Sequence, residues 1–179
     1  VLTNHFSFWL DWDDLIFKDY GSRMKHNLSF SGGTEKLSFY LSGGMYEEQG
    51  IIKPADDGFE RYNVSATINA EINDWLSMSF LTKYRSSNSE YPTVGYDESG
   101  NNRSALINWI QRIKPTAAKY WPGTELYTTD NRVDNIMNNK VNELDRQLIV
   151  APRLIIEPIK DWVTTIELNY TTNDNNHNT

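Results

Sequence analysis

Apolar and polar side chains alternate without interruption along residues 61–73. The apolar set consists of Tyr62, Val64, Ala66, Ile68, Ala70 and Ile72, and polar residues fill the positions between them. Strict alternation places all the apolar side chains on one face of a β-strand. Ten residue steps extend about 33 Å, which a tilt of about 40° reduces to about 25 Å, the height of the apolar band of an outer-membrane barrel. Ordinary strands are about half as long, so the run predicts a membrane-spanning strand.

Five further runs alternate in the same way, at about residues 27–31, 37–48, 76–85, 147–157 and 162–171. Pro152 lies inside the fifth strand of the series and has no N–H to donate, so we expect a bulge or an edge defect there. The connections at 32–36, 73–74 and 158–161 are short, whereas those at 50–59 and 87–142 are longer. Short turns at one rim and long loops at the other are typical of outer-membrane barrels.

These patterns predict an all-β fold, an antiparallel up-and-down segment of a transmembrane β-barrel with about six strands and long extracellular loops. Residues 1–24 lead into the barrel from the extracellular side, and 25–86 hold four strands. Residues 87–142 form the long extracellular loop, with a short helix near 106–113 that Ser104 caps and Pro115 ends. Residues 143–172 hold two more strands, and 173–179 begin the next extracellular loop. A soluble β-sandwich shows the same alternation and remains the alternative.

Composition narrows the functional classes. The net charge of −7 argues against a nucleic-acid partner, which needs a basic face. No apolar run approaches the length of a membrane-spanning helix, and the absence of cysteine excludes disulfides and Cys-based zinc sites. Because the chain starts at Val1 without an initiator Met or a signal peptide, we expect it to be part of a longer protein.

Catalytic chemistry finds little support in the sequence. The three histidines lack metal-ligand spacing, and neither a nucleophile motif nor a phosphate-binding loop is present. Asp11, Asp13 and Asp14 lie close together but do not follow the calcium-loop pattern, which favours a solvated turn. We therefore predict no enzyme activity, no metal site and no cofactor.

Two groups of residues are candidates for binding. The charged positions of the polar strand faces would line the lumen of the barrel, where they hold a plug or meet solute: Arg61, Glu71, Lys83, Arg85, Arg153 and Glu167. Aromatic side chains of the long loop are candidates for stacking on sugar rings: Trp109, Tyr120 and Trp121. Packing of the loop against its neighbours is the simpler explanation for these aromatics.

Several stretches, in order and spacing, resemble the SusC/RagA family of TonB-linked outer-membrane proteins. They cover about residues 9–86: WDDLIF at 12–17, HNLSFSGGTEK at 26–36, EQGII at 48–52, FERYN at 59–63 and NDWL at 73–76. The resemblance implies a barrel of roughly 22 strands filled by a plug, which imports oligosaccharides or peptides with a SusD-like lipoprotein lid and energy from TonB. The segment would lie in the lipid bilayer of the Gram-negative outer membrane as a multi-pass wall.

Three functions therefore stay open at this point. The first is part of a TonB-dependent importer, the second is a structural or adhesive outer-membrane barrel, and the third is a soluble carbohydrate-binding β-sandwich. Six strands cannot enclose a pore, because even eight leave an interior filled by side chains. The segment is thus expected to act only within the whole protein.

Overall fold

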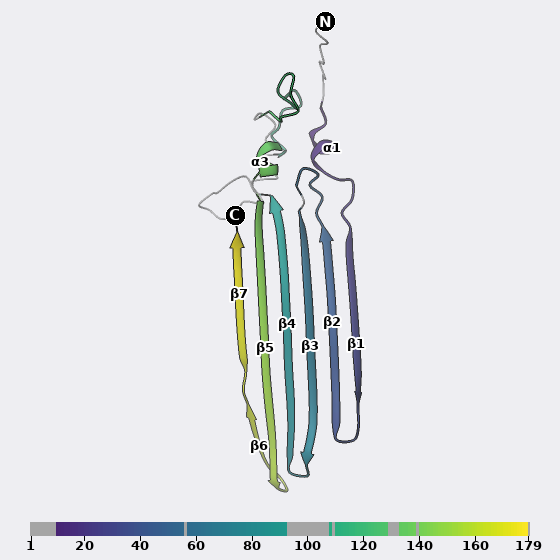
Figure 1. Ribbon diagram of the computed structural model, residues 1–179, viewed down its shortest axis with the longest axis vertical. Helices are drawn as coiled ribbons and strands as arrows, with labels where there is room; N and C mark the ends of the chain where they lie inside the picture. Colours follow the sequence, from purple (N-terminus) through teal and green to yellow (C-terminus); the bar gives the residue numbers. More distant parts are fainter. Residues whose placement is uncertain are drawn as a thin grey trace.

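The computed structural model describes residues 10–55, 57–92, 108, 110–128, 133–138 and 140–178. The strands form one antiparallel sheet, listed in chain order: β1 (Arg23–Gly33), β2 (Leu37–Gln49), β3 (Gly58–Asn73), β4 (Leu76–Pro92), β5 (Lys140–Ile159), β6 (Trp162–Glu167) and β7 (Tyr170–Asn178). Each strand from β1 to β5 pairs with the next, and β6 and β7 both pair with β5 (Figure 1). The predicted all-β, up-and-down architecture is confirmed.

β6 and β7 are two parts of one long strand. Glu167 pairs with Arg153 and Tyr170 pairs with Val150, so the register against β5 is the same on both sides of the gap. The gap lies opposite Pro152, which accepts a bond from the Leu168 N–H at 3.0 Å but has no N–H to return. The expected defect thus falls in the partner strand, and residues 173–178 continue the strand instead of beginning a loop.

The strands extend further toward the long loops than the alternation indicated. β4 continues to Pro92, β5 begins at Lys140 and β1 begins at Arg23. Residues 87–92 and 140–142, which we had expected in the long loop, therefore belong to the sheet. The difference has a physical reason, because backbone pairing needs a partner strand and does not require apolar side chains. The polar run at 86–90 carries no alternation signal that would reveal it.

The register separates the two faces of the sheet as the alternation predicts. Ile68 lies beside Phe39 and Phe80 on one face, while Thr67 lies beside Tyr40 on the other. The apolar face is widely exposed, with Leu28 at 62% and Val64 at 58% of full exposure. The described residues form a single sheet, so no second layer covers this face as a soluble sandwich would require. A contiguous apolar surface of this extent is typical of the lipid-facing side of a barrel wall.

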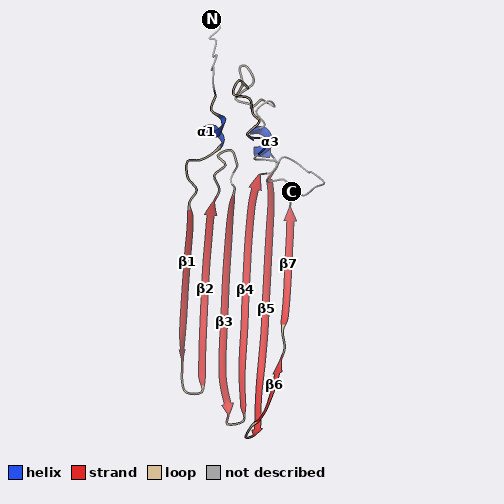
Figure 2. Ribbon diagram, turned by 180° about the vertical axis from the view of Figure 1, so that it is seen from behind, coloured by secondary structure: helices blue, strands red, loops and turns tan. Residues whose placement is uncertain are grey.

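The connections gather at opposite ends of the sheet. The short turns lie at one rim, whereas the longer connections, α1 (Trp12–Ile16) and α3 (Val133–Asn138) lie at the other, which we call the loop rim (Figure 2). Within the helix expected at 106–113, Asn108 and Ile110 are helical, and a turn follows Ile110. Residues 106, 107 and 109 lie outside the described residues. In the described ranges, no helix has the length and apolarity to cross a membrane.

A compact core sits at the loop rim. Its buried side chains come from α1, from the loop at 50–57, from residues 110–128 and from α3: Trp12, Ile16, Ile52, Ala55, Ile110, Ile113, Val133 and Ile136. We call these four segments the cap. Trp12 also donates from Nε1 to the carbonyl of Lys114 at 3.1 Å, and the Leu10 N–H donates to Pro115 at 3.2 Å. Segments about 100 residues apart in the chain are thereby joined into one body.

Candidate functional site at the loop rim

All six charged residues that we predicted to line the lumen lie on the polar face. The pairing of Asn63 with Arg85 and of Ser65 with Lys83 places the two cations of β4 beside the polar residues of β3. The same register puts Arg153 and Glu167 opposite each other on β5 and β6. Arg61 and Glu71 occupy the same set of alternating positions of β3 as Asn63. The polar face thus carries these charges; their contacts with solute remain a prediction.

Two of these cations have partners within the sheet. Arg153 donates from Nε to Glu167 at 2.9 Å, and its Nη2 lies 2.8 Å from the same carboxylate oxygen. The Arg61 guanidinium lies 5.5 Å from the centre of the Tyr46 ring, a cation–π arrangement. These contacts join neighbouring strands on the polar face. Because Arg153 and Arg61 already have partners, they attract other groups less strongly.

Lys83 and Arg85 differ from the other cations. They stand two residues apart on the same face of β4, and within the described ranges neither forms an ion pair. Like charges this close repel each other unless an anion lies between them. Binding of an anionic group by Lys83 and Arg85 is therefore a prediction.

Gly44 faces the same side as Arg85. A Cβ added at Gly44 would lie 2.7 Å from the Asn27 amide oxygen and 2.8 Å from that of Asn63. The two asparagine side chains thus converge over the glycine from the neighbouring strands. The register of β2 passes through Gly43 and Gly44 without a shift, so the strand has no bulge at this point. The glycine serves close side-chain approach and does not bend the strand.

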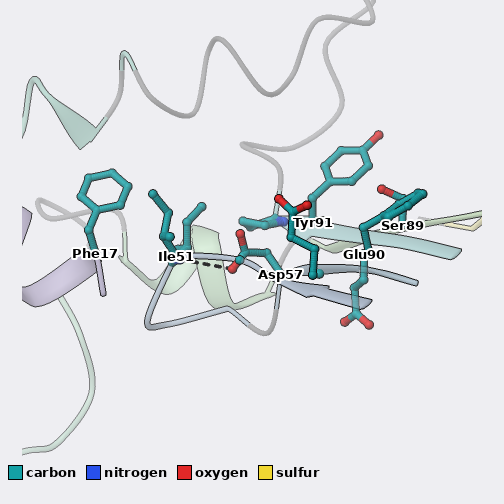
Figure 3. Close-up of a pocket in the computed structure, with 12 residues that line it drawn as sticks. Phe17, Ile51, Asp57, Ser89, Glu90 and Tyr91 are labelled. Carbon is teal, nitrogen blue, oxygen red and sulfur yellow. Dashed lines mark hydrogen bonds between the residues drawn. The ribbon is translucent and has the colours of Figure 1, made fainter. Parts of the chain in front are cut away.

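A cavity of about 320 Å³ lies where the polar face meets the cap (Figure 3). The sheet contributes Glu48, Phe59, Ser89 and Tyr91, the cap contributes mainly the apolar side chains of Ile51 and Ile52, and Phe17 comes from the residue after α1. Glu90 belongs to the same strand as Tyr91 but its carboxylate points to the opposite side of β4 (Figure 3). Tyr91 donates a hydrogen bond from its hydroxyl to Glu143. The cavity is thus mostly apolar, with carboxylates and no Lys or Arg side chain in its lining.

Asp57 closes the loop that forms one wall of this cavity. Its carboxylate accepts a bond from the Ile52 N–H at 3.1 Å, and its carbonyl accepts one from Gly50 at 2.7 Å. A Cβ at Gly50 would fall 1.7 Å from the same carboxylate, so a side chain there would displace Asp57. The pattern of side chains along the sequence does not indicate this role of Asp57. Gly50 is the signal in the sequence for this contact, because a glycine allows another group to come close to the backbone.

Two aromatic residues of the long loop, Tyr120 and Tyr127, face each other across a turn within the cap. Tyr120 and Tyr127 form an isolated bridge with ring centres 5.0 Å apart, and Gly123 adopts a positive φ of 76° at the bend. The Trp121 indole is half-exposed at this turn. Tyr120 and Trp121 are thus near each other, while Trp109 lies outside the described residues.

The two tyrosines of this turn titrate differently. A hydrogen bond with Lys119 lowers the pKa of Tyr120, and the Lys119 ammonium lies 4.9 Å from the Tyr120 ring centre. Burial raises the pKa of Tyr127, and its hydrogen bond with Tyr120 acts in the same direction. Tyr120 therefore offers an aromatic face that already has a cation beside it.

The acidic residues near the start of the chain have a structural role. Asp11 caps α1, with its carboxylate accepting bonds from the N–H groups of Asp13 at 3.1 Å and Asp14 at 3.3 Å. Such a cap satisfies donors that the first helical turn leaves free. Across the described part of the chain, no group of three His, Cys, Asp or Glu residues is arranged to hold a metal ion.

Comparison with known proteins supports this architecture. The chain is 24% identical over 129 residues to TonB-dependent receptor P3 of Formosa agariphila, covering 72% of this chain and 12% of that protein. It is 35% identical over 68 residues to TonB-dependent receptor P39 of the same organism, covering 38% of this chain and 6% of the relative. No family model matches the sequence. The chain thus spans only a small part of the curated relatives.

Solved structures extend the comparison to the fold. The RagAB peptide importer in its closed-closed state aligns with 94% of this chain and 19% of its own, with a TM-score of 0.60 and 20% identity. The structure of the RagAB peptide transporter aligns with 93% of this chain and 20% of its own, with a TM-score of 0.56 and 19% identity. At this level of identity the likeness concerns the fold alone.

The long two-faced strands and the loop rim thus give the chain the fold of a barrel-wall segment, and its sequence is similar to parts of two TonB-dependent receptors. The resemblance to the SusC/RagA family, which first rested on short motifs at residues 12–76, is confirmed, and the segment represents part of the barrel only.

Proposed function

We propose that the chain forms part of the wall of a SusC-like importer of the outer membrane, which spans the bilayer as a multi-pass barrel and draws energy from TonB. The observation that carries the proposal is the two-faced sheet, whose exposed apolar side and charged opposite side suit lipid and an aqueous lumen respectively. Relatives named as receptors and an importer favour transport over a purely structural or adhesive barrel. The loop rim then faces the outside and the short turns face the periplasm.

The solute of this importer is an oligosaccharide or a peptide. The cavity between the cap and the polar face lies where solute enters from the outside, and its aromatic walls suit sugar rings or apolar side chains. The half-exposed Trp121 indole and the Tyr120 ring offer a second stacking surface on the cap. A SusD-like surface lipoprotein acts as the lid and rests on this cap, because the cap is the part of the segment that projects beyond the sheet (Figure 1).

Uptake by the full-length parent protein tests the function. Cells carrying the parent gene are grown on labelled oligosaccharides or peptides, with and without TonB, and lid binding is measured by co-purification of the neighbouring lipoprotein. Deleting residues 104–123 is expected to impair uptake or lid binding while the barrel still assembles. Trp121→Ala should weaken solute binding, whereas Leu126→Ala, a change at the same turn that removes no aromatic ring, should not.

Three outcomes count against the proposal. Uptake that persists without TonB excludes an energised importer. Normal uptake and normal lid binding in the deletion reduce the loop to a passive connection. If the barrel assembles but cells carrying the parent gene take up none of the tested oligosaccharides and peptides, the structural or adhesive function is favoured.

A further inference from the structure

The lipid-facing side of the sheet is interrupted at Gly43. Leu28 and Val64 flank this glycine in the register of β1, β2 and β3. A Cβ added at Gly43 would meet no atom nearer than the Asn63 carbonyl at 4.0 Å. The adjacent Gly44, which faces the lumen, is instead covered by two amides within 2.9 Å. The gap is therefore open on the lipid side and closed on the lumenal side.

This gap is part of a larger trough on the lipid-facing surface. The trough has a volume of about 770 Å³. The register of the strands places its lining residues His26, Gly43 and Ala66 on a diagonal across β1, β2 and β3. The three strands lie side by side in both ribbon views (Figures 1 and 2). Large side chains form its two walls, with one wall made of Met45, Tyr62 and Val64 and the other of Leu28, Phe30 and Leu41. Gly43 and Ala66, the two small residues on this diagonal, thus form the floor, and His26 lies at its end.

The dimensions of the trough restrict what can enter it. From His26 to Ala66 the diagonal crosses two strand spacings, about 10 Å, and four residues along the strands, about 14 Å, giving a length of about 17 Å. A helix with its side chains is about 10–12 Å thick and is too wide for a floor one residue across. A strand would have to pair at a free sheet edge, and β2 already has partners on both sides. A single polymethylene chain is narrow enough for this floor, and it needs no free sheet edge in order to bind.

We propose that this trough, called the Gly43 trough, binds one acyl chain of a lipid in the outer leaflet. Its walls are apolar and it is continuous with the lipid-facing surface, so the chemistry of the occupant is that of the surrounding hydrocarbon. It lies at the end of the apolar band nearest the loop rim, with Tyr62 and His26 at its upper end, where the lipid head group begins. The assignment to the outer leaflet rests on the proposed orientation of the importer, whereas the trough itself does not.

Photolabelling of the parent barrel in vesicles tests this site. The probe is a phospholipid with a photoreactive group on its acyl chain, and labelled residues are identified by mass spectrometry. The walls at Met45, Tyr62 and Leu28 should be labelled several-fold more than Leu148, which lies in the same row on β5. Gly43→Phe, which fills the trough, should reduce wall labelling to the level of Leu148. Thr172→Phe adds the same ring in that row on β7 and should leave wall labelling unchanged.

The readout separates this inference from the proposed function. Assembly of each variant is checked by heat-modifiable migration in gels, and Gly43→Leu replaces Gly43→Phe if the latter fails to assemble. Uniform labelling along the row, or unchanged labelling after the trough is filled, overturns the acyl-chain site. Adding the probe to one leaflet at a time tests the orientation, and labelling only from the leaflet at the short turns refutes the outer-leaflet assignment and the proposed topology.

Discussion

A charge placed in the middle of the lipid-facing surface gives the sharpest test of the barrel wall. Ile68 lies six residues from Tyr62 and four from Ile72 on the same face of β3. These separations correspond to about 20 Å and about 14 Å along the strand, so Ile68 is near mid-depth. Its neighbours across the strands are Phe39 and Phe80, which leave an introduced charge without a polar partner.

Ile68→Arg should therefore destabilise the folded barrel strongly. Arginine at the midplane of a barrel costs about 2–4 kcal/mol, a change of about 30- to 700-fold in the folding equilibrium. The matched control is Thr67→Arg, because Thr67 precedes Ile68 and faces the lumen beside Tyr40. There the guanidinium stays hydrated, and we expect a loss below about 1 kcal/mol.

Reversible urea unfolding of the full-length parent in lipid vesicles measures both changes. The midpoint and slope of the transition give the free energy of unfolding for each variant. An equal loss in the two variants would show that β3 does not separate lipid from water. A larger loss for Thr67→Arg would invert the two faces, as a one-residue slip in register does.

Three further changes test other parts of the structure. Gly33→Ala would place a Cβ 2.2 Å from the backbone carbonyl of Leu37, so we expect a loss of about 1–3 kcal/mol in the same urea assay, while Gly43→Ala, with open space around it, should cost less. Gly50→Ala should displace the Asp57 carboxylate and speed protease cleavage of the loop at 50–57. Unchanged cleavage would show that the contact between Gly50 and Asp57 does not hold this loop in place. Ile16→Ala removes a fully buried side chain from the cap and should lower cap stability by about 2–5 kcal/mol, which faster amide exchange in α3 would show. Unaltered exchange would mean that the cap segments do not act together.

The alternation of side chains could predict the wall because it is a local property of the chain. A strand that separates lipid from water needs an apolar residue at every second position, so the faces of β3 and its neighbours follow from order alone. The six charged lumenal candidates could be placed on one face for the same reason. Alternation weakens where both faces are hydrated, and the ends of β4 and β5 near the loop rim were therefore underestimated.

Contacts between distant segments could not be predicted in this way. Asp57 and Gly50 meet only because the loop between β2 and β3 folds back on itself, and Trp12 joins the long loop through packing that no local pattern records. The two adjacent glycines of β2 serve opposite faces, which alternation implies, but only the neighbouring strands decide that Gly44 is covered and Gly43 is open. Sequence order determines which side a residue faces, because side-chain direction is set by the backbone of one strand. Which atoms then fill the space beside it depends on the strands and loops that fold against it, and tertiary structure alone decides that.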